Sequence, residues 1–218
     1  MVKGCSCGRS RTAKLPGVKI DFVREKLGAH IPEQAGMSDR AHAAVAIVFR
    51  EGTGSVEVLL IERAERADDP WSGHMAFPGG RLEHSDDSSL STARRETFEE
   101  VGIELAKAEY LGQLDDILGN PRSGPTLVVA AHAFFLTEKQ KIELDPREVR
   151  DAFWFPLAEM LEESRSVEYM IAQRPEAPYP GILVGIPGRH VVWGLTYRFL
   201  ENLLNVLGHS LPRASPPS

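Results

Sequence analysis

Cysteine is nearly absent from this chain, whose 218 residues include only Cys5 and Cys7. Two cysteines are too few for a disulfide framework, and no further ligands stand at the spacing that a zinc site requires. We therefore expect two free thiols and a cytoplasmic location. The first residues are basic but contain no apolar stretch, so they do not predict a secretory signal.

Long apolar runs and an excess of basic residues are also missing. No hydrophobic segment reaches the roughly 20 residues that cross a bilayer, so we expect no membrane association. The formal net charge of -6 argues against a nucleic-acid polymer as partner, because such proteins present a clustered basic surface. A small anionic substrate is not excluded, since a bound metal ion supplies positive charge locally.

The composition changes only at the two ends of the chain. Residues 1–16 combine Gly, Ser and basic residues with little apolar content, and we expect a flexible N-terminal arm. Residues 17–211 show neither a repeat nor a second core and are expected to form a single α/β domain. Residues 212–218 are rich in Pro and Ser and predict a loose tail.

Short apolar runs separated by turn residues predict several strands. Two of these runs flank a turn at 52–55 and predict a hairpin, at residues 43–49 and 56–61. Other strands are expected at residues 75–77, 109–114, 127–136, 152–155, 182–186 and 190–193. Helical turns are expected at residues 21–27, 157–163 and 195–206, and the Pro-rich residues 174–181 are expected to be irregular.

A further polar helix is expected to begin near residues 86–88 and to end at Gly102. Ser85 or Asp86 is the expected N-cap, because short polar side chains accept hydrogen bonds from the first N–H groups of a helix. Residues at helical spacing predict the face that this helix buries, namely Leu90, Ala93, Thr97 and Val101.

Three glutamates lie on the flank of that buried face. Residues three and four apart share one side of a helix, so Glu96, Glu99 and Glu100 crowd together although like charges at this spacing repel. A divalent cation is the simplest reason to tolerate them, because hard ions bind carboxylate oxygens. The alternative is a solvated acidic helix face, and the glycine pair at the right distance before the helix favours the metal.

Hydrolysis of a phosphoanhydride suits such an acidic cluster. Divalent ions neutralise a diphosphate, activate a bound water and orient in-line attack. At Gly79 and Gly80, which we expect to form a turn, the missing side chains let the backbone approach an ion or a phosphate. Arg95 is expected to hold Glu99, four residues further along the helix, through a charge-assisted hydrogen bond.

Residues 79–103, which read GGRLEHSDDSSLSTARRETFEEVGI, resemble the Nudix box. The match covers the Arg-Glu-x-x-Glu-Glu-x-Gly-hydrophobic part of that pattern. The interval between the glycine pair and the arginine is one residue longer than the pattern, so Asp86 or Asp87 replaces its internal glutamate. Thr97 stands where an apolar residue is usual.

The resemblance implies an α/β/α sandwich around a mixed β-sheet. It also implies a hydrolase that uses Mg²⁺ or Mn²⁺ to cleave a nucleoside diphosphate linked to another moiety. By position, Glu96 and Glu100 would be the main metal ligands, and Glu99 a third ligand or a hydrogen-bond partner of a metal-bound water. The carbonyl of Gly80 or its neighbour would complete the site, and Arg95 would support the catalytic glutamates.

A narrower resemblance concerns the substrate. The stretches LLIERAERADDPWSGHMAFPGGRLEHSD and VVWGLTYRFLENLL are similar to segments of Nudix coenzyme A pyrophosphatases. This similarity implies that coenzyme A or its acyl forms are cleaved to 3′,5′-ADP and phosphopantetheine products. ADP-ribose, other nucleotide sugars and dinucleotides remain alternative substrates. A homodimer is also a prediction, because dimers are frequent among Nudix proteins.

Outside the box, several residues are candidates for the site. Arg63 and Arg81 would contact phosphates or form surface salt bridges, and His74 would contact substrate or serve as a hydrogen-bonded structural histidine. Glu148 is our candidate for a general base or extra metal ligand, with Asp145 behind it, because many Nudix enzymes use a loop glutamate outside the box.

The aromatic residues have two readings. Tyr169 and Tyr179 border the Pro-rich segment and would flank an adenine or pack at an edge, whereas Trp154 and Trp193 are expected in the core rather than as platforms that stack on a base. Two rival functions follow from the same scaffold. A non-catalytic nucleotide-binding module would usually lack one of the box glutamates, and an isomerase would need a cysteine in the folded region, so both rank below the hydrolase.

Overall fold

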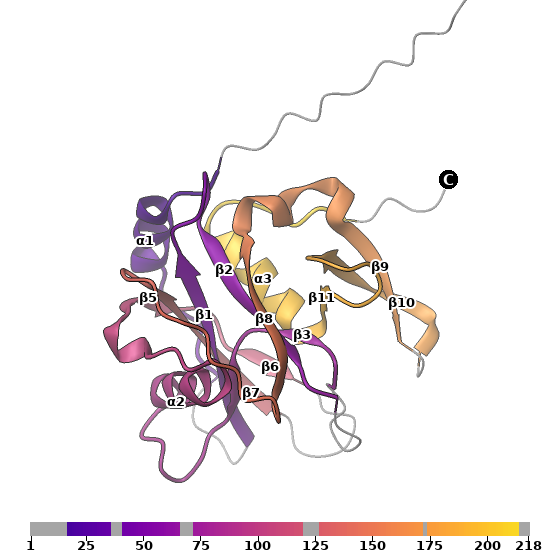
Figure 1. Ribbon diagram of the computed structural model, residues 1–218. Coiled ribbons are helices and arrows are strands. Elements are labelled where there is room, and N and C mark those ends of the chain that lie inside the picture. The colour runs from indigo at the N-terminus through magenta and orange to yellow at the C-terminus, as the bar shows by residue number, and fades with distance from the viewer. Residues whose placement is uncertain (1–16, 36–40, 66–71, 120–126, 172–173, 214–218) are drawn as a thin grey trace, which may run out of the picture.

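The computed structural model describes residues 17–35, 41–65, 72–119, 127–171 and 174–213 of the chain (Figure 1). The expected arm at 1–16, with both cysteines, and most of the expected tail lie outside the described residues. Among the helices of the described residues, none is both long and apolar enough to cross a bilayer.

The secondary structure consists of runs of strands separated by a few helices. The longer helices are α1 (Ile20–Ala29), α2 (Ser89–Val101) and α3 (Gly194–Val206), and three short 3₁₀ turns lie at Leu105–Lys107, Leu157–Leu161 and Glu163–Arg165. The strands are β1 (Ala41–Arg50), β2 (Glu57–Arg63), β3 (Met75–Ala76), β4 (Gly79–Arg81), β5 (Glu109–Gln113), β6 (Ile117–Gly119), β7 (Leu127–Phe135), β8 (Val149–Pro156), β9 (Ser166–Ile171), β10 (Arg174–Leu183) and β11 (Val191–Trp193).

Eight of these strands form one mixed sheet, which we call the main sheet. Its central path runs β3-β2-β1-β7-β5, while β4 pairs with β1, β6 with β7 and β8 with β2. The β1–β7 pair is parallel and all other pairs are antiparallel. The predicted hairpin is confirmed, because β1 and β2 meet at Phe49 and Val58.

The two faces of the main sheet are covered by different helices (Figure 1). Along β1, Ala44, Ala46 and Val48 belong to the apolar cluster that contains Ala93 and Val101 of α2. The alternate residues of β1, such as Ile47 and Phe49, belong to a larger cluster with residues of α1 and α3. Because successive strand residues point to opposite faces, this division confirms the predicted α/β/α sandwich.

Helix α2 has a defined cap at each end. Ser88, rather than Ser85 or Asp86, is the N-cap: its hydroxyl accepts the Ser91 N–H at 3.2 Å, and the Ser91 hydroxyl accepts the Ser88 N–H at 2.9 Å. Gly102 ends the helix as predicted, with a left-handed φ of 70° that glycine adopts without strain. The predicted inner face is buried at Ala93, Thr97 and Val101, while Leu90 is partly buried.

Two local predictions were wrong. The glycine pair at 79–80, expected as a turn, lies in the short strand β4, which pairs with residues 43–45 of β1. The Pro-rich residues 174–181, expected as irregular, belong to β10. Prolines cannot donate to a strand ladder, and two of them fall at a shift in register between Arg174 and Tyr179, where no ladder bond is required.

Strands β9, β10 and β11 form a second antiparallel sheet of order β11-β10-β9, which we call the C-terminal sheet. Helix α3 begins at Gly194, directly after β11. Ile182 and Val192 of this sheet share one apolar cluster with Phe199 and Leu203 of α3 and with residues of the main sheet. The C-terminal sheet therefore packs against the main sheet through a common core, and β11 contacts β3.

Candidate active site

Three glutamates from two elements converge beside β4. Glu96 and Glu100 lie one helical turn apart on α2, and Glu148 directly precedes β8. One carboxylate oxygen from each glutamate lies within 4.8 Å of one from each of the other two, and the three side chains are partly or fully buried. Side chains at positions i and i+4 of a helix share one face, which explains why the two helical members point to the same place.

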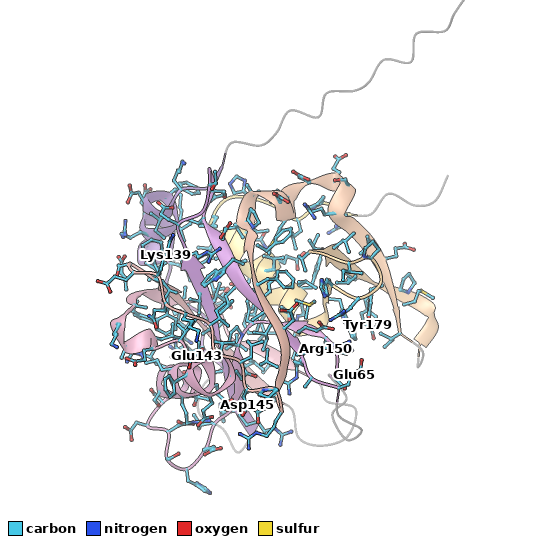
Figure 2. The ribbon with its side chains drawn as sticks, viewed as in Figure 1. Glu65, Lys139, Glu143, Asp145, Arg150 and Tyr179 are labelled. Atoms are coloured by element: carbon cyan, nitrogen blue, oxygen red, sulfur yellow. The ribbon has the colours of Figure 1, made fainter. Side chains whose placement is uncertain are left out.

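Backbone hydrogen bonds bring Glu148 to the end of α2. The segment before β8 docks on the last turn of this helix, where the Glu143 N–H donates to the Val101 carbonyl at 2.9 Å and the Asp145 N–H to the Glu100 carbonyl at 3.1 Å. The Ala64 N–H then donates to the Glu148 carbonyl at 2.8 Å. Asp145 lies beside this helix end (Figure 2).

Glu100 is the most buried member of the cluster, with 1% of its surface exposed. Its carboxylate accepts the Gly79 N–H at 2.9 Å, and the guanidinium of Arg63 lies 3.6 Å away. Burial raises the pKa of Glu100 to about 8 against the opposing effects of these two donors. Burial likewise raises the pKa of Glu96. These two carboxylates are therefore costly to ionise unless a cation lies beside them.

This donor set fits a divalent cation of the Mg²⁺ type. Such ions take oxygen ligands, and three carboxylates at this spacing offer them on rigid elements. Burial raises the pKa of Glu96 and of Glu100 because it disfavours the charged carboxylate, and a cation bound between them would favour that charged form. The site therefore passes the test of charge and ligand type for the predicted metal.

The glycine pair is required by close packing around these carboxylates. A Cβ atom at Gly80 would lie 2.3 Å from the carboxylate carbon of Glu96. A Cβ atom at Gly79 would lie 2.3 Å from the carbonyl oxygen of Ala44 on β1. The absence of side chains thus lets β4 run between β1 and the acidic face of α2.

Arg95 joins the helix to the loop that precedes it. Its guanidinium donates twice to Asp86, at 3.0 and 2.9 Å, and also to Glu96 at 3.0 Å and to the Arg81 carbonyl at 3.1 Å. Asp86 also accepts hydrogen bonds from the Glu83 N–H and the Thr92 hydroxyl, both at 3.0 Å. The Arg95 hydrogen bonds hold the pKa of Asp86 well below its usual range.

Asp86 is therefore a structural anchor of the box, a role that the sequence left open between Asp86 and Asp87. Asp87 is exposed. The departure at Thr97 has a simple explanation, because its buried hydroxyl donates to the Ala93 carbonyl at 2.7 Å and so needs no other partner.

Glu99 does not join the carboxylate cluster of the described residues. Its side chain is about half exposed and accepts a hydrogen bond from Arg95 at 2.9 Å, as predicted for this pair. Asp145, our second choice beside Glu148, also points elsewhere: its carboxylate accepts hydrogen bonds from the exposed guanidinium of Arg147. The structure thus brings Glu96, Glu100 and Glu148 together and separates the other two acids from them.

The cluster lies on the wall of a cavity of about 630 Å³. Besides the three glutamates and the glycine pair, all three predicted substrate-binding residues line this cavity, namely Arg63, His74 and Arg81. The wall therefore carries cationic and anionic groups side by side, which is the arrangement that a metal-bound diphosphate requires.

The rest of the cavity wall is apolar and was missed by the sequence analysis. It is formed by residues of β1, β7 and α3, including Val45, Val129 and Phe199. Trp193, which we expected in the core, lines the cavity and is only partly buried. Trp154 lies elsewhere, 4.4 Å beneath the guanidinium of Arg50. Charged groups at one end and apolar groups at the other are typical of a small-molecule site.

Comparison with known proteins agrees with this geometry. The family description of the NUDIX domain matches residues 40–173, which include the glycine pair, α2 and Glu148. A crystal structure of a MutT/nudix family protein from Enterococcus faecalis has a TM-score of 0.50 and 16% sequence identity, and the match covers 91% of this chain and 76% of that chain. This likeness supports the fold.

The chain is similar in sequence to proteins of fission yeast and mouse. The uncharacterized protein C14C4.10c of Schizosaccharomyces pombe is 41% identical over 140 residues, which are 56% of this chain but only 43% of that protein. The mitochondrial coenzyme A diphosphatase NUDT8 of Mus musculus is 29% identical over 167 residues, or 77% of this chain and 78% of that protein. From the matched domain and the acidic cluster within it, we conclude that the chain belongs to the Nudix hydrolase family.

Proposed function

We propose that this chain is a metal-dependent pyrophosphatase that cleaves the diphosphate linkage of coenzyme A or its acyl forms, yielding 3′,5′-ADP and a phosphopantetheine product. The observation that carries the proposal is the convergence of Glu96, Glu100 and Glu148 on the wall of a cavity that Arg63 and Arg81 also line. ADP-ribose or another dinucleotide is the alternative substrate, because it presents the same diphosphate.

In this proposal Glu96 and Glu100 hold Mg²⁺ or Mn²⁺, with the carbonyl of Gly80 as a further oxygen donor. Glu148, the third member of the cluster, is either an extra ligand or the general base. When bound, the metal neutralises the diphosphate and makes a coordinated water a better nucleophile. The Gly79 N–H and Arg63 orient the carboxylate of Glu100, since both contact it directly. Arg95 orients Glu96 in the same way.

The remaining roles follow from position. Arg63 and Arg81 line the cavity beside the cluster and are suited to contact the phosphate oxygens, because a guanidinium binds phosphate through two donors. Glu148 is the candidate general base, since it belongs to the cluster but lies on a different element from the other two glutamates. Glu99 acts through Arg95, whose guanidinium it shares with Glu96.

Coenzyme A is favoured over the alternatives by the sequence comparison. The mouse relative, which the chain matches over about three quarters of both lengths, is named a coenzyme A diphosphatase. The cavity volume of about 630 Å³ lies in the usual range of small-molecule sites. That relative is named mitochondrial, so the cytoplasmic location stays a prediction for this chain, as does the homodimer.

The test is a panel of coenzyme A, acetyl-coenzyme A, ADP-ribose, NADH, diadenosine polyphosphates and dNTPs, assayed with Mg²⁺ and with Mn²⁺. We expect the highest kcat/KM with coenzyme A substrates, and products that separate the two phosphates. The variant Glu100→Gln should lose activity by about a hundredfold or more, since supporting groups of a metal site alone account for 10- to 100-fold effects.

Glu138→Gln is the matched control, because Glu138 is an exposed glutamate that does not line the cavity. Circular dichroism would show that both variants are folded. Normal turnover by Glu100→Gln would refute the proposed metal site. A preference for ADP-ribose over every coenzyme A substrate would refute only the proposed substrate.

A further inference from the structure

One wall of the cavity comes from a part of the chain that the NUDIX domain match does not reach. The match ends at residue 173, whereas Trp193 of β11 and the first residues of α3 line the cavity. His74, directly before β3, completes this wall from the main-sheet side. The substrate site is therefore built from the family domain together with the C-terminal sheet.

Three aromatic side chains gather on one face of the C-terminal sheet, and we call them the aromatic shelf: Tyr169, Tyr179 and Trp193. In the ladder, Tyr179 stands opposite Tyr169, and Gly181, two residues after Tyr179, stands opposite Trp193, which places the three side chains on the same face. The Trp193 ring centroid lies 5.0 Å from that of Tyr169 and 5.3 Å from that of Tyr179.

The shelf is joined to the cavity through Trp193. The imidazole of His74 meets the Trp193 ring edge-on, with the centroids 4.7 Å apart, and both residues line the cavity. Gly181 stands opposite Trp193 on β10, and Gly194 follows Trp193 in the chain. Neither position carries a side chain beside the Trp193 ring. Trp193 is thus a partly buried ring at the cavity wall, backed by the two tyrosines (Tyr179 is labelled in Figure 2).

An ion pair between a partly exposed arginine and a buried glutamate joins the turn after β10 to the main sheet. Arg189, in the turn between β10 and β11, donates to both carboxylate oxygens of Glu62 on β2, at 2.8 and 2.6 Å. Glu62 is 1% exposed, and the Arg189 hydrogen bonds lower its pKa. The next residue on β2 is Arg63, which lines the cavity. One strand therefore carries both the glutamate of this ion pair and a cation of the candidate phosphate site.

We propose that the aromatic shelf is the nucleobase subsite and that Trp193 stacks on the adenine of the substrate. The inference rests on the proposed function, which places the diphosphate at the acidic cluster. The adenine is the only flat aromatic part of coenzyme A and of ADP-ribose, and stacking on aromatic side chains contributes roughly 1–3 kcal/mol per base. Pantetheine and ribose have no such face, so they are assigned to the apolar wall and the rim.

The first test measures binding without turnover. AMP, ribose 5-phosphate and pantetheine are titrated separately into the full chain with no divalent metal added, and tryptophan fluorescence is followed alongside calorimetry. We expect AMP to bind and to quench the fluorescence. Trp193→Phe should abolish the quenching but keep most of the affinity, whereas Trp193→Leu should weaken AMP binding about tenfold.

Trp154→Phe is the matched control, because this tryptophan does not line the cavity. The control should keep both the quenching and the affinity. AMP quenching that survives in Trp193→Phe would overturn the proposal even if Trp193→Leu fails to fold. Equal binding of AMP and ribose 5-phosphate, or pantetheine binding that depends on Trp193, would also overturn it.

The second test uses the turnover reaction with Mg²⁺. Coenzyme A and ADP-ribose share the adenine but differ in the other half, so Trp193→Leu should raise KM about tenfold for both and change kcat little. A rise for coenzyme A alone would place the base elsewhere. If no panel substrate is cleaved but AMP binds through Trp193, the proposed function fails while the subsite stands. If cleavage is lost in Glu100→Gln but unaffected in Trp193→Leu, the proposed function stands while the proposed subsite fails.

Discussion

Gly80 approaches the carboxylate of Glu96 so closely that no side chain fits between them. Gly80→Ala must displace the carboxylate or β4, and we expect the metal requirement of the enzyme to change more than its stability. The concentration of Mg²⁺ that gives half-maximal activity should rise about tenfold or more, as for lost supporting groups at metal sites. Titration of activity with Mg²⁺, at saturating substrate, measures this effect.

Gly28→Ala provides the control for that experiment, because a Cβ atom at this position of α1 meets nothing within 4 Å. An unchanged Mg²⁺ requirement in Gly80→Ala would show that Glu96 is not constrained by the glycine. An equal rise in the Mg²⁺ requirement of both variants would show that the effect is not specific to position 80.

A second residue-scale prediction concerns His132 on β7, which is 3% exposed. One ring nitrogen lies 2.9 Å from the Ser89 hydroxyl and the other 3.1 Å from the Tyr110 hydroxyl. Burial lowers the pKa of His132 from 6.5 to about 4. Between these two values the unfolded chain binds a proton that the folded chain does not, so the stability contribution is present above pH 6.5 and is lost as pH falls toward 4.

The loss amounts to at most about 3 kcal/mol, because each pKa unit corresponds to about 1.4 kcal/mol. Urea unfolding of the wild type and of His132→Gln, at several pH values from 7 to 4, should show a shallower pH dependence in the variant. His84→Gln, which changes an exposed histidine, serves as the control. Parallel curves for the wild type and His132→Gln would contradict the assignment.

At the scale of elements, the site depends on how the loop before α2 is tied to the helix. Asp86 receives two hydrogen bonds from Arg95 and two more from its own loop and helix. Asp86→Ala leaves the buried part of the Arg95 guanidinium without its main partner. We expect a loss of about 1–3 kcal/mol in the free energy of unfolding, the usual cost of an unsatisfied buried group.

Asp86→Ala should also lower kcat, because Arg95 then no longer holds Glu96 in one orientation. Thermal unfolding and Mg²⁺-dependent kinetics measure the two effects, with the exposed Asp87→Ala as the matched change. If Asp87→Ala proves the more damaging of the two, the internal acid of the box has been misassigned.

Helical spacing predicted α2 and its acidic side, because spacing is a local property, but that argument grouped all three glutamates. The resemblance to the Nudix box singled out Glu96 and Glu100 as the main ligands. These two are four residues apart and share a face, whereas Glu99 is rotated by about 100° from Glu100 at 3.6 residues per turn. In the structure Glu99 accordingly reaches Arg95 rather than the cluster.

Other features depend on contacts between distant segments, which spacing does not encode. Glu148 reaches the cluster only because residues 143–145 bond to the end of α2. Ser88 becomes the N-cap because Asp86 is already engaged by Arg95. Trp193 reads as a core residue in sequence, and only the packing of the C-terminal sheet places it on the cavity wall.

At the scale of the whole molecule, metal binding and stability are linked. A ligand that binds only the folded state stabilises it by about 2.7 kcal/mol at a hundred times its Kd. We therefore expect Mg²⁺ to raise the Tm of the wild type in a concentration-dependent manner. Glu100→Gln should abolish this rise, and in the absence of metal it should be at least as stable as the wild type, because burial disfavours the charged carboxylate.

Calorimetric scans over a range of Mg²⁺ concentrations measure both parts of this prediction. Na⁺ at matched ionic strength separates specific binding from salt screening. A Tm rise of the same size in Glu100→Gln would mean that the ion binds elsewhere on the protein.

The parallel register of β1 with β7 sets the order in which the enzyme can assemble. Ala41 pairs with Leu127, so the ladder joins positions 127 − 41 = 86 residues apart, and the glycine pair and α2 lie inside the loop that it closes. Closing such a long loop slows folding, because the chain loses conformational entropy before the stabilising contacts between β1 and β7 have formed. On the ribosome, a nascent chain that has not yet exposed β7 and Glu148 has the acidic helix α2 but not the cluster of three glutamates, so we expect activity only after both have emerged.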